Sequence, residues 1–259
     1  MAYTNIDDPS AYFQTTLYTG NNAGGASNTI TNNGNSDLQP DWVWAKARSG
    51  AANHNNSDSS RGATKHLAQN ITLYEEIVAG ISGYNSNGFT LGSNNDANFN
   101  GATYVAWQWK ANGGTTTAFS ESGNNPGGTY QANTTAGFSI VTYTGTGAAG
   151  TVTHGLGVAP KLIIIRNRDV ADPWAVYYGD ATDYLVLNTT AATVDNAAWW
   201  NDTAPSSTVF TVNTDHSVNA DAETYVAYCF AEVQGYSKFG TYVGNSNVNG
   251  PFVYLGFSP

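Results

Sequence analysis

Two stretches decide the fold of this 259-residue chain: residues 101–111 read GATYVAWQWKA, and residues 222–231 read AETYVAYCFA. In each stretch large aromatic residues alternate with smaller ones, and this period of two marks a half-buried β-strand. Tyr104 and Tyr225 occupy the same place in the two stretches, 121 positions apart. The chain is therefore expected to contain the same strand twice.

The repetition extends beyond these strands. GFTL at 88–91 corresponds to VFTV at 209–212, again 121 positions apart, and PDWVW at 40–44 corresponds to PKLII at 160–164 at an offset of 120. Self-similarity at a fixed offset is the signature of a repeat architecture. The sequence therefore predicts two homologous units.

A third, partial copy lies at the C-terminal end of the sequence. Residues 143–160 and 242–259 match without a gap at tyrosine, glycine, leucine and proline positions. We expect residues 238–259 to form a β-hairpin that docks on the second unit or adds a strand to a neighbouring subunit, because an uncovered apolar strand edge invites pairing. The side chains expected to make this contact are those of Phe252, Tyr254 and Phe257.

Turn-forming Asn, Gly, Asp and Ser residues separate the strand patterns, and helix signals are scarce. Such closely spaced strands favour a sandwich or jelly roll. We predict an all-β chain of two tandem homologous antiparallel β-sandwich units of jelly-roll type, followed by the C-terminal hairpin. The predicted boundaries are 1–111 for the first unit, 112–137 for a Gly/Thr/Asn-rich linker, 138–237 for the second unit and 238–259 for the hairpin.

Composition excludes several classes of function. Charged residues make up only 11% of the chain, against about 25% in an average soluble protein, and the formal net charge is −10. The nine scattered Lys and Arg residues offer no basic surface to a phosphate backbone, so we expect no nucleic-acid partner. No apolar run reaches the roughly 18 residues of a membrane helix, so we expect no membrane insertion. The single cysteine, Cys229, excludes an internal disulfide.

The sequence carries no recognisable catalytic motif. None of the four histidines has a histidine or cysteine at metal-ligand spacing, and there is no nucleophile elbow, phosphate loop or dinucleotide fingerprint. We therefore expect a protein that is not an enzyme and has no cofactor. A polysaccharide hydrolase that brings two distant carboxylates together in space stays open as an alternative.

Two acidic turns at matching places in the units are candidates for a low-affinity Ca²⁺ site. Their carboxylates are those of Asp96 in the first unit and of Asp215 and Asp221 in the second. Neither turn fits the twelve-residue EF-hand loop. The alternative interpretation is that these residues form ordinary Asx turns between strands.

Three tryptophans are candidates for stacking on a sugar. Trp199 and Trp200 stand in an Asn/Asp context typical of an exposed loop, and Trp42 shares a strand face with Trp44. The alternative is core packing, the usual place of an aromatic residue on a strand. A glycan-binding site at Trp199, Trp200 and Trp42 is thus one hypothesis.

Distinctive motifs are spread over nearly the whole chain: DDPSAYF at 7–13, QPDWVW at 39–44, SRGATK at 60–65, GFTLGS at 88–93 and GPFVYLGF at 250–257. Together they resemble a repeat family of uncharacterised virion structural and tail-fibre-like proteins of bacteriophages, especially marine ones. The second unit departs from that pattern, with ATDY at 181–184 where the first has RGAT at 61–64. The resemblance carries no catalytic residue over to this chain.

The resemblance implies a protein of the virion surface, most simply a tail-fibre or receptor-binding component that contacts the host surface. A capsid decoration protein is the first alternative, and a glycan-binding module or polysaccharide hydrolase is the second. The N-terminal residues 1–13 show no signal peptide, so we expect synthesis in the host cytoplasm. The expected partners are other virion proteins, further copies in a homotrimer, which multivalent attachment favours, and host surface polysaccharide.

Overall fold

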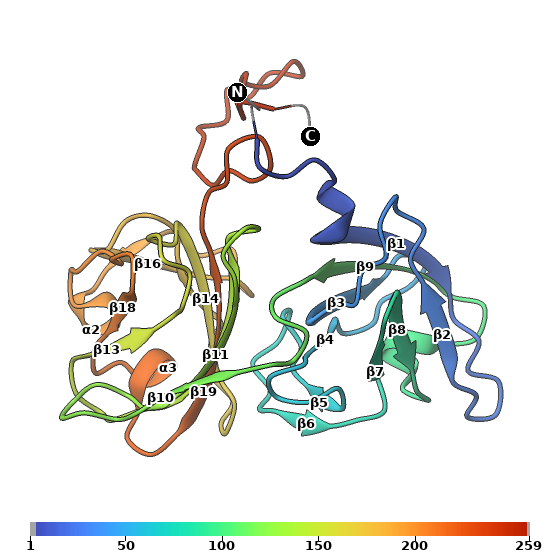
Figure 1. Cartoon of the computed structure of the whole chain (residues 1–259), viewed down its shortest axis with the longest axis horizontal. Coiled ribbons are helices and arrows are strands. Elements are labelled where there is room, and N and C mark those ends of the chain that lie inside the picture. Colours follow the sequence, from blue (N-terminus) through green and yellow to red (C-terminus); the bar gives the residue numbers. More distant parts are fainter. Residues whose placement is uncertain (1–3, 258–259) are drawn as a thin grey trace.

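The computed structural model describes residues 4–257, in which two β-rich units lie side by side (Figure 1). In the first unit the aromatic stretch is an inner strand of a four-stranded antiparallel sheet, and its alternating pattern supplies one set of side chains to each face. The strand order is β1-β9-β3-β4, with the bounds β1 (Phe13–Thr19), β3 (Trp42–Ala47), β4 (Asn55–Asp58) and β9 (Thr103–Trp109).

The second unit contains the same arrangement within a longer sheet of eight strands. β12, β19, β14 and β15 repeat the order of β1, β9, β3 and β4, and further strands extend the sheet at both ends. The eight strands, in sheet order, are β10 (Thr117–Phe119), β11 (Gly128–Asn133), β12 (Phe138–Thr144), β19 (Thr224–Phe230), β14 (Leu162–Asn167), β15 (Ala175–Tyr177), β16 (Asp183–Val186) and β17 (Val194–Asp195).

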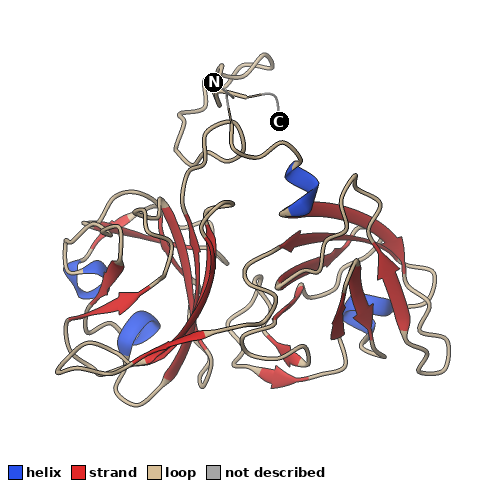
Figure 2. Ribbon diagram, viewed as in Figure 1, coloured by secondary structure: helices blue, strands red, loops and turns tan. Residues whose placement is uncertain are grey.

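A smaller sheet packs on one face of each large sheet and closes a sandwich (Figure 2). The small sheets are β2-β8-β7 in the first unit and β13-β18 in the second. Their bounds are β2 (Asn28–Thr31), β7 (Ile81–Asn85), β8 (Gly88–Leu91), β13 (Gly150–Thr153) and β18 (Val209–Val212). The remaining short elements are η1 (Pro9–Ala11), β5 (Lys65–His66), β6 (Glu76–Ile77), α1 (Asn95–Asn98), α2 (Ala197–Trp200) and α3 (His216–Asn219).

The prediction of two tandem homologous antiparallel sandwiches is confirmed, and a pair of tyrosines shows it in detail. The rings of Tyr18 and Tyr104 stack 5.0 Å apart in the first core, and those of Tyr143 and Tyr225 stack 5.0 Å apart in the second. In each unit the first tyrosine donates its hydroxyl hydrogen bond to a backbone carbonyl of the short helix α1 or α3. The repeated sequence therefore encodes a repeated core.

The predicted linker at 112–137 contains two strands of the second unit's large sheet, and there the prediction is wrong. Residues 128–133 form β11, which pairs with all but the last residue of β12, and 117–119 form β10 beside it. Gln131 of β11 is buried and donates hydrogen bonds to the hydroxyls of Ser59 and Ser60 in the first unit. The Gly- and Thr-rich composition hid β10 and β11, which pair with each other and with the next strand along the chain, β12.

The predicted C-terminal hairpin is not formed in the described residues. Between 238 and 257 the chain contains no strand, and it rises above the two units in Figure 1, while residues 258 and 259 lie outside the described range. The corresponding strand β12 is held by β11 on one side and β19 on the other, and no such pair of strands flanks this segment. Among residues 4–257 no helix is long and apolar enough to cross a membrane.

Candidate functional site between the two units

The outer faces of the two large sheets meet and form an aromatic junction. Trp42 of β3 lies at its centre, with ring centroids 4.3 Å from Trp109, 4.1 Å from Tyr228 and 5.9 Å from Phe138. Trp42 and Trp109 belong to the first unit, and Tyr228 and Phe138 belong to the second. The alternation of aromatic residues thus serves an interface between the units, while the opposite faces of the same strands serve the sandwich cores.

A buried charge network lies beside these rings. Arg61 contacts Asp58 at 2.5 Å and Glu75 at 2.8 Å, and Glu75 also pairs with Arg168 of the second unit at 2.9 Å. The hydroxyl of Tyr228 donates to the Asp58 carboxylate at 2.7 Å. Burial opposes the charge of Arg61, but Asp58, Tyr228 and Glu75 outweigh it and raise its pKa well above the ordinary value. Removing one partner would leave a buried charge unpaired, so the network fixes how the units sit together.

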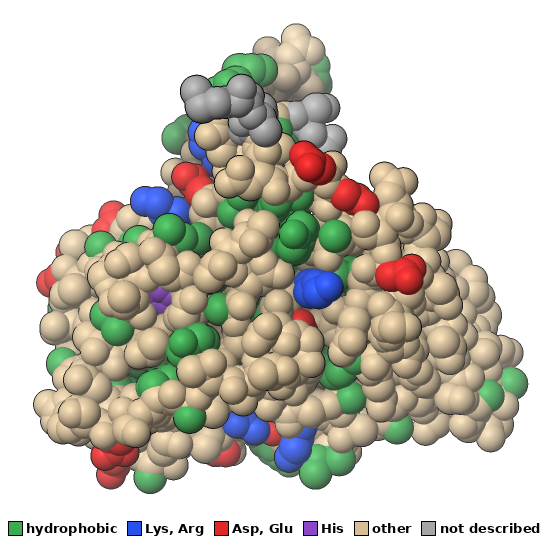
Figure 3. Space-filling view, viewed as in Figure 1, with side chains coloured by type: hydrophobic (Ala, Val, Ile, Leu, Met, Phe, Trp, Pro, Cys, Tyr) green, Lys and Arg blue, Asp and Glu red, His purple; other side chains and the backbone are tan. Residues whose placement is uncertain are grey.

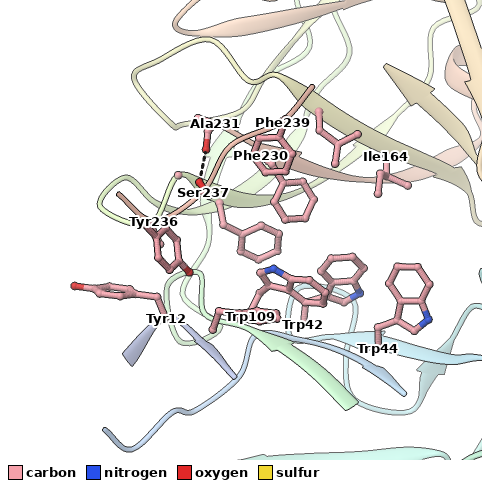
Figure 4. A pocket seen from close by; sticks show the side chains of 15 residues that line it. Tyr12, Trp42, Trp44, Trp109, Ile164, Phe230, Ala231, Tyr236, Ser237 and Phe239 are labelled. Carbon is pink, nitrogen blue, oxygen red and sulfur yellow. Dashed lines mark hydrogen bonds between the residues drawn. The ribbon is translucent and has the colours of Figure 1, made fainter. Parts of the chain in front are cut away.

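Next to the junction an aromatic cleft of about 320 Å³ opens between the units (Figure 4). Figure 4 shows Trp42, Trp44 and Trp109 on one side and Ile164 and Phe230 on the other. The cleft is lined by Tyr12, Phe13, Trp42, Trp44, Trp109, Ala136, Gly137, Phe138, Leu162, Ile164, Phe230, Ala231, Tyr236, Ser237 and Phe239.

The segment after β19 forms one wall of the aromatic cleft. Phe239 packs on Phe230 with ring centroids 5.7 Å apart, and Tyr236 meets the ring of Tyr12 edge to face at 6.4 Å. Burial, and then the neighbouring Tyr12, raise the pKa of the Tyr236 hydroxyl. The hydroxyl of Ser237 donates a hydrogen bond to the carbonyl of Ala231 at 3.2 Å. The wall therefore offers the cleft mainly aromatic surface.

The chemistry of the aromatic cleft suits apolar side chains. No Asp, Glu, Lys, Arg or His is among the residues that line it. Pockets that combine aromatic rings with few polar groups bind apolar partners, and such pockets commonly lie at domain interfaces. The sequence contained the signal for it, because Trp44 and Trp109 share strand faces with Trp42 and Trp107, but the pattern alone did not show which face meets the other unit.

The structure corrects the proposed sugar-stacking tryptophans. Trp199, Trp200 and Trp42 are only 4%, 1% and 1% exposed, so none presents a ring face to a sugar. Trp199 stacks on Tyr184 at 3.7 Å, and Trp200 meets Tyr177 edge to face, both inside the core of the second unit. The short helix α2 turns both rings inward, which an Asn/Asp-rich context did not reveal.

The three candidate Ca²⁺ ligands, Asp96, Asp215 and Asp221, have different local roles and do not form a metal site. Asp215 caps α3 by accepting a hydrogen bond from the backbone N–H of Ser217 at 2.9 Å, Asp96 lies in the first turn of α1, and Asp221 is exposed in the turn before β19. Residues 4–257 contain no group of three or more His, Cys, Asp or Glu side chains placed to hold a metal ion. For Asp215 the structure agrees with the alternative interpretation, an Asx turn.

The three residues of the expected hairpin contact are not docked as a strand. Phe252 is 90% exposed and Tyr254 is 69% exposed, whereas Phe257 is half-buried. The ammonium group of Lys238 lies 5.7 Å from the ring centroid of Tyr254, which ties the segment loosely to its own start. Tyr254 and Phe257 therefore lie near Ser237 at the wall of the aromatic cleft, and Phe252 extends into solvent.

Comparison with known proteins identifies a family to which the sequence is similar. The sequence profile of a family described as a domain of unknown function (DUF7483) matches residues 8–259. No curated protein and no solved structure matches the chain.

Proposed function

We propose that this chain, which belongs to the DUF7483 family of domains of unknown function, is a structural protein of a bacteriophage surface. Its role is that of a tail-fibre or receptor-binding component, one of assembly and attachment rather than catalysis. The observation that carries the proposal is the aromatic junction, which joins two sandwiches into one body. The motif resemblance over nearly the whole sequence supports the phage setting.

An attachment protein has to hold its binding surface at a fixed position relative to the particle. A hinge motion between the units would expose Trp42, Phe138 and Tyr228 and would separate Glu75 from Arg168. Each large apolar side chain brought into water costs about 1.5–3 kcal/mol. The two units therefore behave as a rigid building block.

The C-terminal segment supplies a means of joining copies. Tyr242, Val243, Phe252 and Tyr254 are all strongly exposed, and the segment begins at the wall of the aromatic cleft. Exposed apolar groups of this kind mark interaction surfaces. We propose that they contact the aromatic cleft of a second copy, and that the assembly is a homotrimer on the particle.

Mass spectrometry and labelling of purified particles of the phage that encodes this sequence test the proposal. We expect the protein in the particles, with antibody-gold labels at the tail. Labels over the capsid would establish the decoration-protein alternative in place of the tail role. Absence from the particles would overturn the proposal as a whole.

A further inference from the structure

A second cavity, of about 600 Å³, opens at the loop end of the first unit, away from the aromatic cleft. It lies between the loop that follows β3 and the chain from α1 to β9. Its walls combine one exposed aromatic residue with polar side chains and small residues. The residues that matter here are Phe99, Asp96, Asn100, Asn95, Ser49 and Tyr104.

The cavity holds its aromatic residue in a fixed place. The hydroxyl of Tyr104 donates a hydrogen bond to the carbonyl of Asn95 at 3.0 Å and accepts one from the backbone N–H of Phe99 at 2.9 Å. Phe99 is nevertheless 56% exposed. Because the hydrogen bond to Tyr104 holds the backbone of Phe99 and the ring is not packed in the core, the ring is available to a ligand.

Polar groups beside this ring are also available. Within residues 4–257 the carboxylate of Asp96 and the side-chain amide of Asn100 make no hydrogen bond or ion pair. Two other polar side chains of the cavity already have partners. Asn95 accepts a hydrogen bond from the side-chain amide of Asn22, and the hydroxyl of Ser49 accepts one from the backbone N–H of Thr103. The cavity therefore presents one ring, one free carboxylate and one free amide.

The matching place in the second unit is built differently. Ala220 stands where Phe99 stands, and its N–H bonds to the hydroxyl of Tyr225 as that of Phe99 bonds to Tyr104. His216 stands where Asn95 stands, and its ring contacts Asp172 at 3.1 Å and Glu223 at 3.2 Å. Polar groups are paired with one another there, so the combination of a free ring and free polar groups is particular to the first unit.

We infer that the cavity at Phe99 binds a neutral sugar residue of a glycan. The apolar face of the sugar ring packs on Phe99, its hydroxyls donate to the carboxylate of Asp96, and Asn100 supplies both a donor and an acceptor. An acidic sugar would place a second negative charge beside Asp96 in a chain of net charge −10, and is disfavoured. The inference deepens the proposed function and rests on it for the source of the glycan, a host surface polysaccharide.

A printed array of bacterial polysaccharide fragments, neutral and acidic, tests the site with the purified full chain. We expect binding to one or more neutral glycans, a loss of about tenfold in Phe99→Ala, and a loss of several-fold in Asp96→Asn. Leu17→Ala is the control, because Leu17 on β1 is similarly exposed, at 61%, and does not line this cavity. Its binding should equal that of the wild type.

Three results would overturn the inference: no glycan bound, binding confined to acidic glycans, or binding that Phe99→Ala and Asp96→Asn leave unchanged. A melting curve for each variant separates loss of the site from loss of the fold, and Asp96→Asn removes no packing. The array uses isolated protein, so its result is independent of particle incorporation. A silent array would leave the virion role standing, and absence from particles would leave the sugar site standing.

Discussion

The two units keep the same tyrosine pair but fill the middle of the core differently. In the first unit Thr16, Asn32 and Gln108 form a buried hydrogen-bonded group, with Gln108 Nε2 2.6 Å from Asn32 Oδ1 and 3.0 Å from the hydroxyl of Thr16. Strand register places Val141 at the position of Thr16 and Cys229 at that of Gln108. One backbone arrangement thus accepts a polar or an apolar centre, and in the first unit the three polar side chains at this centre are partners of one another.

The edges of the large sheets differ as well. β11 covers the outer edge of β12, whereas β1 is the last strand of its sheet among the described residues. The surroundings of the units also differ, since Trp42 of the first meets Phe138 and Tyr228 of the second. These rings are buried, and Figure 3 shows the two units as one continuous surface in this view. The sequence pattern shared by the units therefore determines the strands of each unit. The residues that differ between them determine what packs against each sheet.

The largest expected effect comes from breaking the junction on one side. Trp42→Ala should lower the free energy of unfolding by about 3–5 kcal/mol, because it opens a cavity among rings of both units. Leu162→Ala changes the corresponding residue of the second unit, which is only half-buried, and should cost less than half as much. Denaturant unfolding measures both. Equal costs would show that the junction does not depend on Trp42.

The contrast between the polar and apolar cores predicts the next effect. Gln108→Leu should cost about 1–3 kcal/mol, because it removes a partner from Asn32 and from Thr16 inside the core. Cys229→Ala at the corresponding place in β19 removes one buried sulfur atom and should cost about 1 kcal/mol. A Gln108→Leu protein as stable as the wild type would show that the polar group is dispensable.

Two histidines should give the units opposite pH dependence. Burial, and then Arg61, lower the pKa of His66 to about 4 from 6.5, so the unfolded state binds the proton first and stability falls as pH drops from about 6.5 towards 4. Asp172 and then Glu223 raise the pKa of His216 against burial, so its contribution is full below 6.5 and is lost as pH rises through the folded value.

Melting temperatures between pH 4 and pH 8 check this contrast. His66→Gln should flatten the acid side of the profile, and His216→Gln should flatten the side above pH 6.5. If both variants keep the wild-type profile, neither histidine is linked to folding in this way.

The smallest effect on stability is expected in the C-terminal segment. Phe252→Ser with Tyr254→Ser should leave the melting temperature within about 1 °C, because both side chains are exposed. The same change should lower the self-association measured by sedimentation velocity. A variant that assembles like the wild type would remove these residues from the proposed contact.

The sequence predicted the strands that carry the repeat, because alternation and a constant offset depend only on local spacing. It did not reveal β11, whose stability comes from pairing with β12 and from contacts of Gln131 across the units. Nor did it place Trp199 and Trp200, since a four-residue helix decides which way these rings point. In the first case the pairing is with the next strand along the chain, in a composition typical of a loop, and in the second the rings pack on Tyr184 and Tyr177. Neither arrangement leaves an alternating pattern in the sequence.

The only cysteine of the chain, Cys229, lies fully buried in β19, and burial raises the pKa of its thiol to about 12. A thiol in that state reacts with a disulfide reagent only when the surrounding strands separate. The rate of labelling in native buffer therefore reports the opening of the second unit alone, while the first unit contributes no signal. Comparing this labelling rate with that of a Trp42→Ala protein would therefore show whether loss of the junction makes the second unit open more often.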